Sequence, residues 1–187
     1  LGGARVYFFF TSDVGVAAHC VTGVQACALP IGPAALERPR SRGEDPMQNL
    51  DRAMAAANAV IAGLKDKATF SLHICRGNRA SMWHREGKYD EIAERLFGGL
   101  KFDRLLLEYD TERAGGFEPL RYVPKGVTVV LGLITTKVGK VETVEELRKR
   151  IEDASRFIEV GQLALSPQCG FASGIAGPVE PPDLEPR

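Results

Sequence analysis

Segments with the period of a β-strand alternate with segments of helical period along most of this 187-residue chain. Strands are predicted at residues 68–75, 103–109, 127–134 and 163–165, and helices at residues 47–64, 89–97 and 143–157. Strands separated by helices or long crossovers pair in parallel, because the chain returns to the same end of the sheet before each strand. The order of the elements therefore predicts an α/β fold.

The composition is that of one soluble globular domain, with 44% apolar and 26% charged residues. Lys and Arg together number 24, as do Asp and Glu, so no net field favours nucleic acid or a membrane as a partner. Four cysteines are too few for a disulfide framework, which indicates a reducing, cytoplasmic setting. The apolar run Val6–Phe10 is much shorter than the roughly 20 residues of a membrane-spanning helix.

Residues 1–31 show no clear period and look like the conceptual translation of a sequencing adapter rather than native protein. On that interpretation Cys20 and Cys27 have no function. The alternative is a real β-hairpin built on Val6–Phe10 and Val21–Leu29.

Residues 32–46 are rich in Pro, Arg, Gly and Glu and show no apolar periodicity. This composition is typical of a loop or linker. Periodicity begins at Met47, so we expect the folded domain to occupy residues 47–187.

Four potential metal ligands lie at the ends of predicted strands. His73 and Cys75 are two residues apart on one strand and point to one face, Glu108 ends the next strand, and Cys169 follows the last. In parallel α/β folds, functional groups collect where the carboxyl ends of the strands converge. Two thiolates, an imidazole and a carboxylate suit Zn²⁺. A thiol substrate would bind as another sulfur ligand and lose its proton.

Each of these residues also has a purely structural interpretation. Glu108 alone would pair with Arg76, Arg104 or Arg121, and Cys169 alone would be an inert buried thiol. A His-x-Cys pair alone is more often a polar residue beside a small apolar one. The metal site is favoured because successive strand ends deliver all four ligands to one face.

The loop after the first metal strand supplies candidate substrate contacts, Arg76 and Asn78. His84 in the same loop is a candidate proton carrier near physiological pH. Lys137 is a weaker candidate for a substrate carboxylate or phosphate, with an ordinary surface lysine as the favoured alternative.

The segments HICRGN, LLLEYD, FEPLRYVPKG, VLGLITTK and LALSPQCGFAS resemble the carboxyl-terminal catalytic domain of cobalamin-independent methionine synthases and their shorter methionine synthase II-like relatives, over residues 50–173. The resemblance implies the carboxyl-terminal part of a (β/α)8 TIM-type barrel. It also implies zinc held by His73, Cys75, Glu108 and Cys169. The implied reaction moves a methyl group from a methyltetrahydrofolate to the sulfur of homocysteine, giving methionine.

Two departures from that family leave the substrate open. The resemblance implies a histidine that true methionine synthases carry near the end of the strand that here reads Leu131 to Lys137, and this chain has Thr135-Thr136-Lys137 there instead. Only about half of a barrel can be drawn from residues 47–173, where a whole barrel takes roughly 250 residues, so we expect a truncated, poorly soluble and inactive fragment.

Three other functions stay open. A related zinc-dependent thiol alkyltransferase would use a methylcorrinoid or an epoxide as the donor. An inactive zinc-binding fragment would bind the metal alone. A metal-free, decarboxylase-like barrel would use Arg76 and Asp110.

Overall fold

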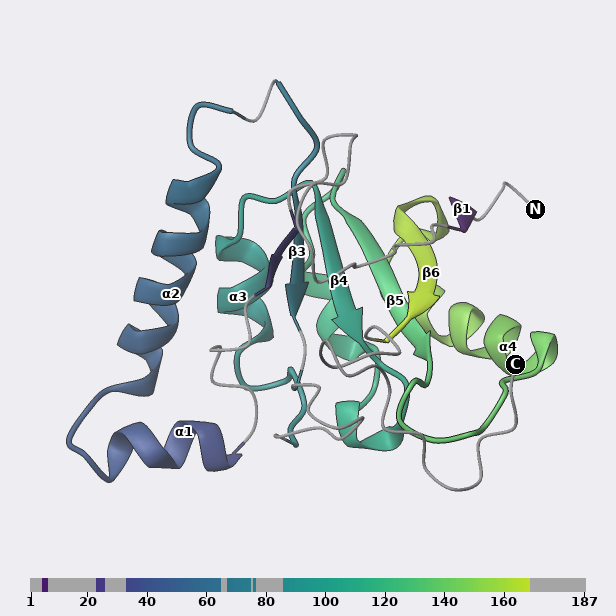
Figure 1. The fold of residues 1–187 in the computed structure, drawn as a ribbon, viewed down its shortest axis with the longest axis horizontal. Helices are drawn as coiled ribbons and strands as arrows, with labels where there is room; N and C mark the ends of the chain where they lie inside the picture. Colours follow the sequence, from purple (N-terminus) through teal and green to yellow (C-terminus); the bar gives the residue numbers. More distant parts are fainter. Residues whose placement is uncertain are drawn as a thin grey trace, which may run out of the picture.

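The computed structural model of the chain describes residues 5–6, 23–25, 33–64, 67–74, 76 and 86–168. These residues form a parallel sheet with the strand order β1-β6-β5-β4-β3-β2 (Figure 1). The strands are β1 (Arg5–Val6), β2 (Gly23–Gln25), β3 (Ser71–Ile74), β4 (Arg104–Glu108), β5 (Thr128–Ile134) and β6 (Leu163–Pro167). Strands β3 to β6 are neighbours in chain order, which is the arrangement of an α/β barrel wall. The predicted α/β class with parallel pairing is confirmed.

Helices and short 3-10 turns connect the strands. The helices are α1 (Pro33–Arg40), α2 (Pro46–Val60), α3 (Ala93–Gly99) and α4 (Val144–Ser155), and the turns are η1 (Glu112–Ala114), η2 (Glu118–Tyr122) and η3 (Val160–Gln162). Figure 1 shows α3 beside β3, α2 outside α3, and α4 on the far side of β5 and β6. Among the described residues, no helix is long and apolar enough to cross a lipid bilayer.

The helix starts follow from local sequence. At α2, the Asp45 side chain accepts a hydrogen bond from the Met47 amide at 2.8 Å, and Pro46 takes the first helical position. At α4, Thr143 and Glu146 form the predicted capping box, each side chain bonding the other residue's amide. These caps satisfy amides that have no partner within the helix.

The two faces of the sheet differ in character. One face packs on the helices and belongs to the buried core through Leu72, Ile74, Leu105, Leu107, Val129, Leu131 and Leu133. Side chains alternate along a strand, and His73 pairs with Leu106 in the ladder between β3 and β4. His73 and Glu108 therefore share the opposite face, as the metal-site prediction requires.

The expectation of a loop at residues 32–46 is wrong in part, because α1 occupies Pro33–Arg40. Pro33 has the fixed φ that suits the first turn of a helix, and Leu36 is buried in the core. The sequence pattern did not predict this helix because Pro39 lies inside it, and proline removes a backbone hydrogen-bond donor. The core thus extends to the amino-terminal side of Met47.

The alternative of an amino-terminal hairpin is wrong for the parts of it that the structure describes. β1 pairs with β6 at one edge of the sheet, and β2 pairs with β3 at the other. The interpretation of residues 1–31 as non-native, and the domain boundary derived from it, stay predictions.

Candidate metal and substrate site

The structure describes two of the four predicted metal ligands. His73 is half-buried on β3, and Glu108 is fully buried at the carboxyl end of β4. Cys75 and Cys169 lie outside the described residues, and so do Asn78 and His84. Among the residues that are described, no group of three or more His, Cys, Asp or Glu side chains is close enough to hold a metal ion.

The Glu108 carboxylate is held from three directions. Its Oε2 accepts a hydrogen bond from the Arg76 amide at 2.7 Å, and its Oε1 accepts one from Arg113 Nη2 at 2.6 Å. The Gln168 side-chain amide also donates to Oε1. Arg76 Nη1 also lies 3.9 Å from Oε2, so arginines reach both oxygens of this carboxylate.

These contacts bear on the two predicted ligands outside the described residues, Cys75 and Cys169. Arg76 directly follows Cys75, and Gln168 directly precedes Cys169. Both chain neighbours bind the same buried carboxylate, although they lie on separate segments. Together with His73, the donor set fits the preference of Zn²⁺ for nitrogen, sulfur and carboxylate ligands.

Arg76 is buried and its guanidinium is bound to protein acceptors. Nε and Nη2 donate to the Gly87 carbonyl at 2.9 and 2.7 Å, and Nη1 donates to the Glu108 carbonyl at 2.9 Å. The guanidinium also lies over the Tyr89 ring, 4.6 Å from its centroid. Arg76 therefore ties the segment around Gly87 to the end of β4, and its contact with substrate stays a prediction.

The Tyr89 hydroxyl joins the ends of β3 and β4. It donates to the Ile74 carbonyl at 3.3 Å and accepts from the Glu108 amide at 3.2 Å and from Arg76 Nη1 at 3.3 Å. Burial raises the pKa of this phenol above its usual 10.0, so the neutral form persists at physiological pH.

A second polar group follows β5 and includes the hydroxyls of Thr135 and Thr136. The Thr135 hydroxyl donates to Asp110 Oδ2 at 3.2 Å, and the Thr136 hydroxyl donates to Gln168 Oε1 at 3.3 Å. Burial raises the pKa of Asp110 above its usual 3.8, and Arg113 partly offsets this effect. The two threonines thus connect β5 to the partners of Glu108.

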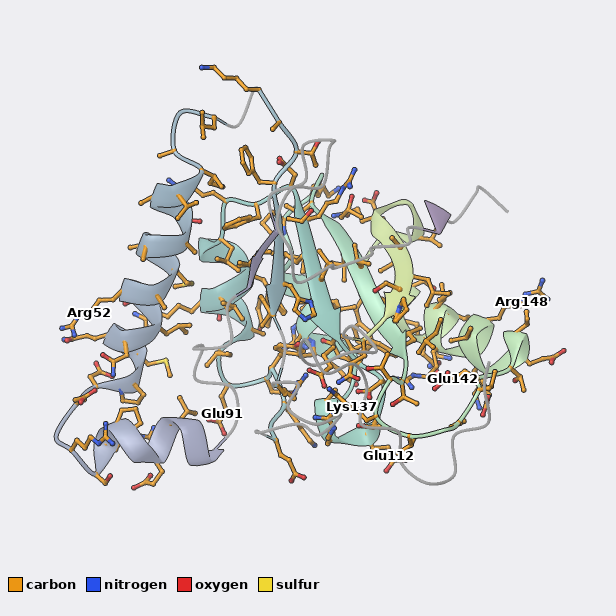
Figure 2. The ribbon with its side chains drawn as sticks, in the orientation of Figure 1. Arg52, Glu91, Glu112, Lys137, Glu142 and Arg148 are labelled. Carbon is orange, nitrogen blue, oxygen red and sulfur yellow. The ribbon has the colours of Figure 1, made fainter. Side chains whose placement is uncertain are left out.

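Lys137 is 5% exposed, so the expectation of a surface lysine is wrong. Figure 2 shows it below the carboxyl ends of the strands, on the side of the molecule where Glu112 and Glu142 also lie. Its amide donates a hydrogen bond to the Thr135 hydroxyl at 3.2 Å. A role in substrate binding stays a prediction.

A cavity lies beside Asp110, next to α4. Its volume is about 320 Å³, and it lies between this helix and the end of β5, lined by Asp110, Glu142 and Arg150 among other residues. Arg150 Nη2 donates to the Tyr109 carbonyl at 2.6 Å, which fixes α4 against β4. Asp110 thus lies between the Glu108 contacts and this cavity.

The partners of Glu108 were only partly foreseen. Of the three arginines that the sequence offered as partners, Arg76 is confirmed, with Nη1 3.9 Å from Glu108 Oε2. Arg121 instead binds Tyr122, and Arg104 lies at the opposite end of β4. The partner with the shortest ion pair, Arg113, was missed because no pattern marks it. Gln168 was detectable in principle from its position beside Cys169.

A parallel sheet wound in chain order, with polar side chains at its carboxyl edge, defines the class of β/α-barrel enzyme domains. The chain belongs to the family described as cobalamin-independent synthase, catalytic domain, whose model matches residues 31–176. That match includes the segment expected to be a linker.

Three relatives illustrate the similarity. The uncharacterized protein YxjG of Bacillus subtilis (strain 168) is 53% identical over 121 residues, which is 64% of this chain and 32% of YxjG. A putative vitamin-B12 independent methionine synthase structure from Listeria monocytogenes has 30% identity and a TM-score of 0.54, over 80% of this chain and 41% of that one. A B12-independent methionine synthase structure from Shewanella sp. W3-18-1, in complex with selenomethionine, has 25% identity and a TM-score of 0.53. The match covers 65% of this chain and 36% of that chain. The chain thus spans less than half the length of each.

Proposed function

We propose that the chain is the metal-binding part of a zinc-dependent methyltransferase that methylates a thiol such as homocysteine, in methionine biosynthesis. The observation that carries the proposal is the buried Glu108 carboxylate, bound by the residues next to Cys75 and Cys169. His73 shares the face of Glu108. The proposed ligands are His73, Cys75, Glu108 and Cys169.

A bound zinc ion would supply Lewis acidity, which converts a thiol into a thiolate at neutral pH. The chain's own residues prepare the site for it. The Arg76 amide and the Gln168 amide fix the Glu108 carboxylate, and Thr136 orients Gln168 in turn. Such partners around a ligand hold it in a binding orientation.

The relatives support methyl transfer to homocysteine. One of the matched structures is described as a putative vitamin-B12 independent methionine synthase, and another as a B12-independent methionine synthase in complex with selenomethionine, an analogue of methionine. The family description, cobalamin-independent, favours a methyltetrahydrofolate-type donor over a methylcorrinoid. Thr135 and Thr136 replace the family's histidine, so this chain handles protons differently or accepts a different thiol.

Metal analysis tests the site directly. The purified chain should bind about one equivalent of zinc, and Cys75→Ala or Cys169→Ala should abolish binding. Cys27→Ala is the matched control, because that cysteine lies in the segment predicted to be non-native. Zinc retained in both ligand variants would contradict the proposal.

Substrate assays separate the remaining alternatives. Zinc-loaded protein is incubated with homocysteine and, in separate reactions, methyltetrahydrofolate, methylcobalamin or an epoxide. Methionine formed only with the folate supports the proposed donor, whereas product with another donor identifies a related alkyltransferase. Zinc binding without any product would show an inactive zinc-binding domain.

A further inference from the structure

Arg113 lies between two buried carboxylates at the end of β4. A single nitrogen, Nη2, is 2.6 Å from Glu108 Oε1 and 3.2 Å from Asp110 Oδ1. The Arg113 side chain is 11% exposed and both carboxylates are 0% exposed. Charges that are shielded from water in this way interact strongly.

We propose that Arg113 is a positioning residue that bridges two carboxylates and releases one of them to a metal ion. Without metal its Nη2 binds both Glu108 and Asp110, and when a divalent cation binds Glu108 it keeps only its bond to Asp110. The inference rests on the proposed zinc site and adds a residue that sets the affinity of that site.

The geometry favours this exchange. The shorter contact is with Glu108, the predicted ligand, so without metal Arg113 neutralises the carboxylate that a cation needs. Asp110 is already within 3.2 Å of the same nitrogen, and Thr135 holds its other oxygen. A small rotation of the guanidinium would therefore release Glu108 while the ion pair with Asp110 is kept.

Electrostatics supplies the driving force. A guanidinium and a divalent cation on the same carboxylate repel each other, and burial prevents water from screening that repulsion. Asp110 provides a negative charge that the metal does not use. Arg113 should therefore weaken metal binding, and Asp110 should reduce that effect.

The test measures zinc affinity by competition with a chromophoric chelator. Arg113→Met removes the competing charge and should tighten zinc binding about ten-fold, an order-of-magnitude expectation for one buried charge. Arg113→Lys retains the charge and should stay near wild type. Arg148→Met is the charge-matched control, because Arg148 is exposed on α4, far from the strand ends (Figure 2), and should not change affinity.

The zinc affinity of Asp110→Asn tests the same proposal without a change to Arg113. It removes the second carboxylate, so Arg113 stays on Glu108 and zinc should bind about ten-fold more weakly. In an Arg113→Met background the same change should have little effect, as a double-mutant cycle would show.

The outcomes separate this inference from the proposed function. If the wild-type chain binds no zinc, the metal site itself fails. If the wild type binds zinc but Arg113→Met binds it equally or more weakly, Arg113 only orients Glu108 and the exchange is refuted. Independent effects of Asp110→Asn and Arg113→Met would refute it as well.

Discussion

Removing the hydroxyl of Tyr89, in Tyr89→Phe, should destabilise the chain without leaving a cavity. The ring keeps its packing against Phe97 and Tyr109, so only the polar contacts are lost. Three hydrogen bonds disappear, to the Ile74 carbonyl, from the Glu108 amide and from Arg76 Nη1.

The magnitude follows from those three contacts. Each is long, at 3.2 to 3.3 Å, so each is worth about 0.5–1 kcal/mol net. The Glu108 amide is also left buried without an acceptor, at a cost of about 1–3 kcal/mol. That cost already includes the lost bond of the Glu108 amide, and the other two bonds add about 1–2 kcal/mol, so the free energy of unfolding should fall by about 2–5 kcal/mol.

Urea unfolding followed by far-ultraviolet circular dichroism measures this change. The matched control is Tyr122→Phe, which removes a hydroxyl that accepts one surface hydrogen bond from Arg121 at 3.1 Å. That variant should stay within about 0.5 kcal/mol of wild type. The reasoning is refuted if Tyr89→Phe is as stable as this control.

Three further variants probe other elements. In Gly132→Ala, the added Cβ would lie 2.9 Å from Gln168 Cα and 3.0 Å from the Leu107 carbonyl, so the unfolding free energy should fall by about 1–3 kcal/mol; unchanged urea unfolding would contradict the close packing. Thr143→Ala removes the amino-terminal cap of α4 and should cost about 1 kcal/mol by the same measurement. The pKa of Glu146 is lowered from 4.5, mainly by the Thr143 amide, so its contribution is present above pH 4.5 and is lost as the pH falls below it. Glu146→Gln should therefore flatten the pH dependence of the melting temperature below pH 4.5. If the melting temperature of this variant falls with acid as steeply as that of the wild type, the effect is absent.

Strands β3 to β6 and three helices could be predicted because residues 47–165 alternate consistently between two periods. In β3 the apolar Leu72 and Ile74 alternate with Ser71 and His73, and this pattern alone fixes which face each side chain occupies. Helix α4 was marked by its capping box. These signals are local, so they can be detected without knowledge of the fold.

The partners of the site could not be predicted in the same way. Arg113 contacts Glu108 because the turn after β4 folds back, and Gln168 reaches Glu108 across β5. Such contacts depend on strand register and turn geometry, which no short pattern encodes. The sequence predicts the ligand types, which stay a prediction, whereas the groups that hold Glu108 are known only from the structure.

The buried Arg76 has a consequence for the thermodynamics of ligand binding. Its bonds to the Gly87 and Glu108 carbonyls, with the Tyr89 hydroxyl beside them, hold the β4 side of the site in place before any metal arrives. Little conformational entropy then remains to be lost there on binding. Calorimetric titration with zinc should accordingly show a larger entropic penalty in Tyr89→Phe than in the wild-type chain.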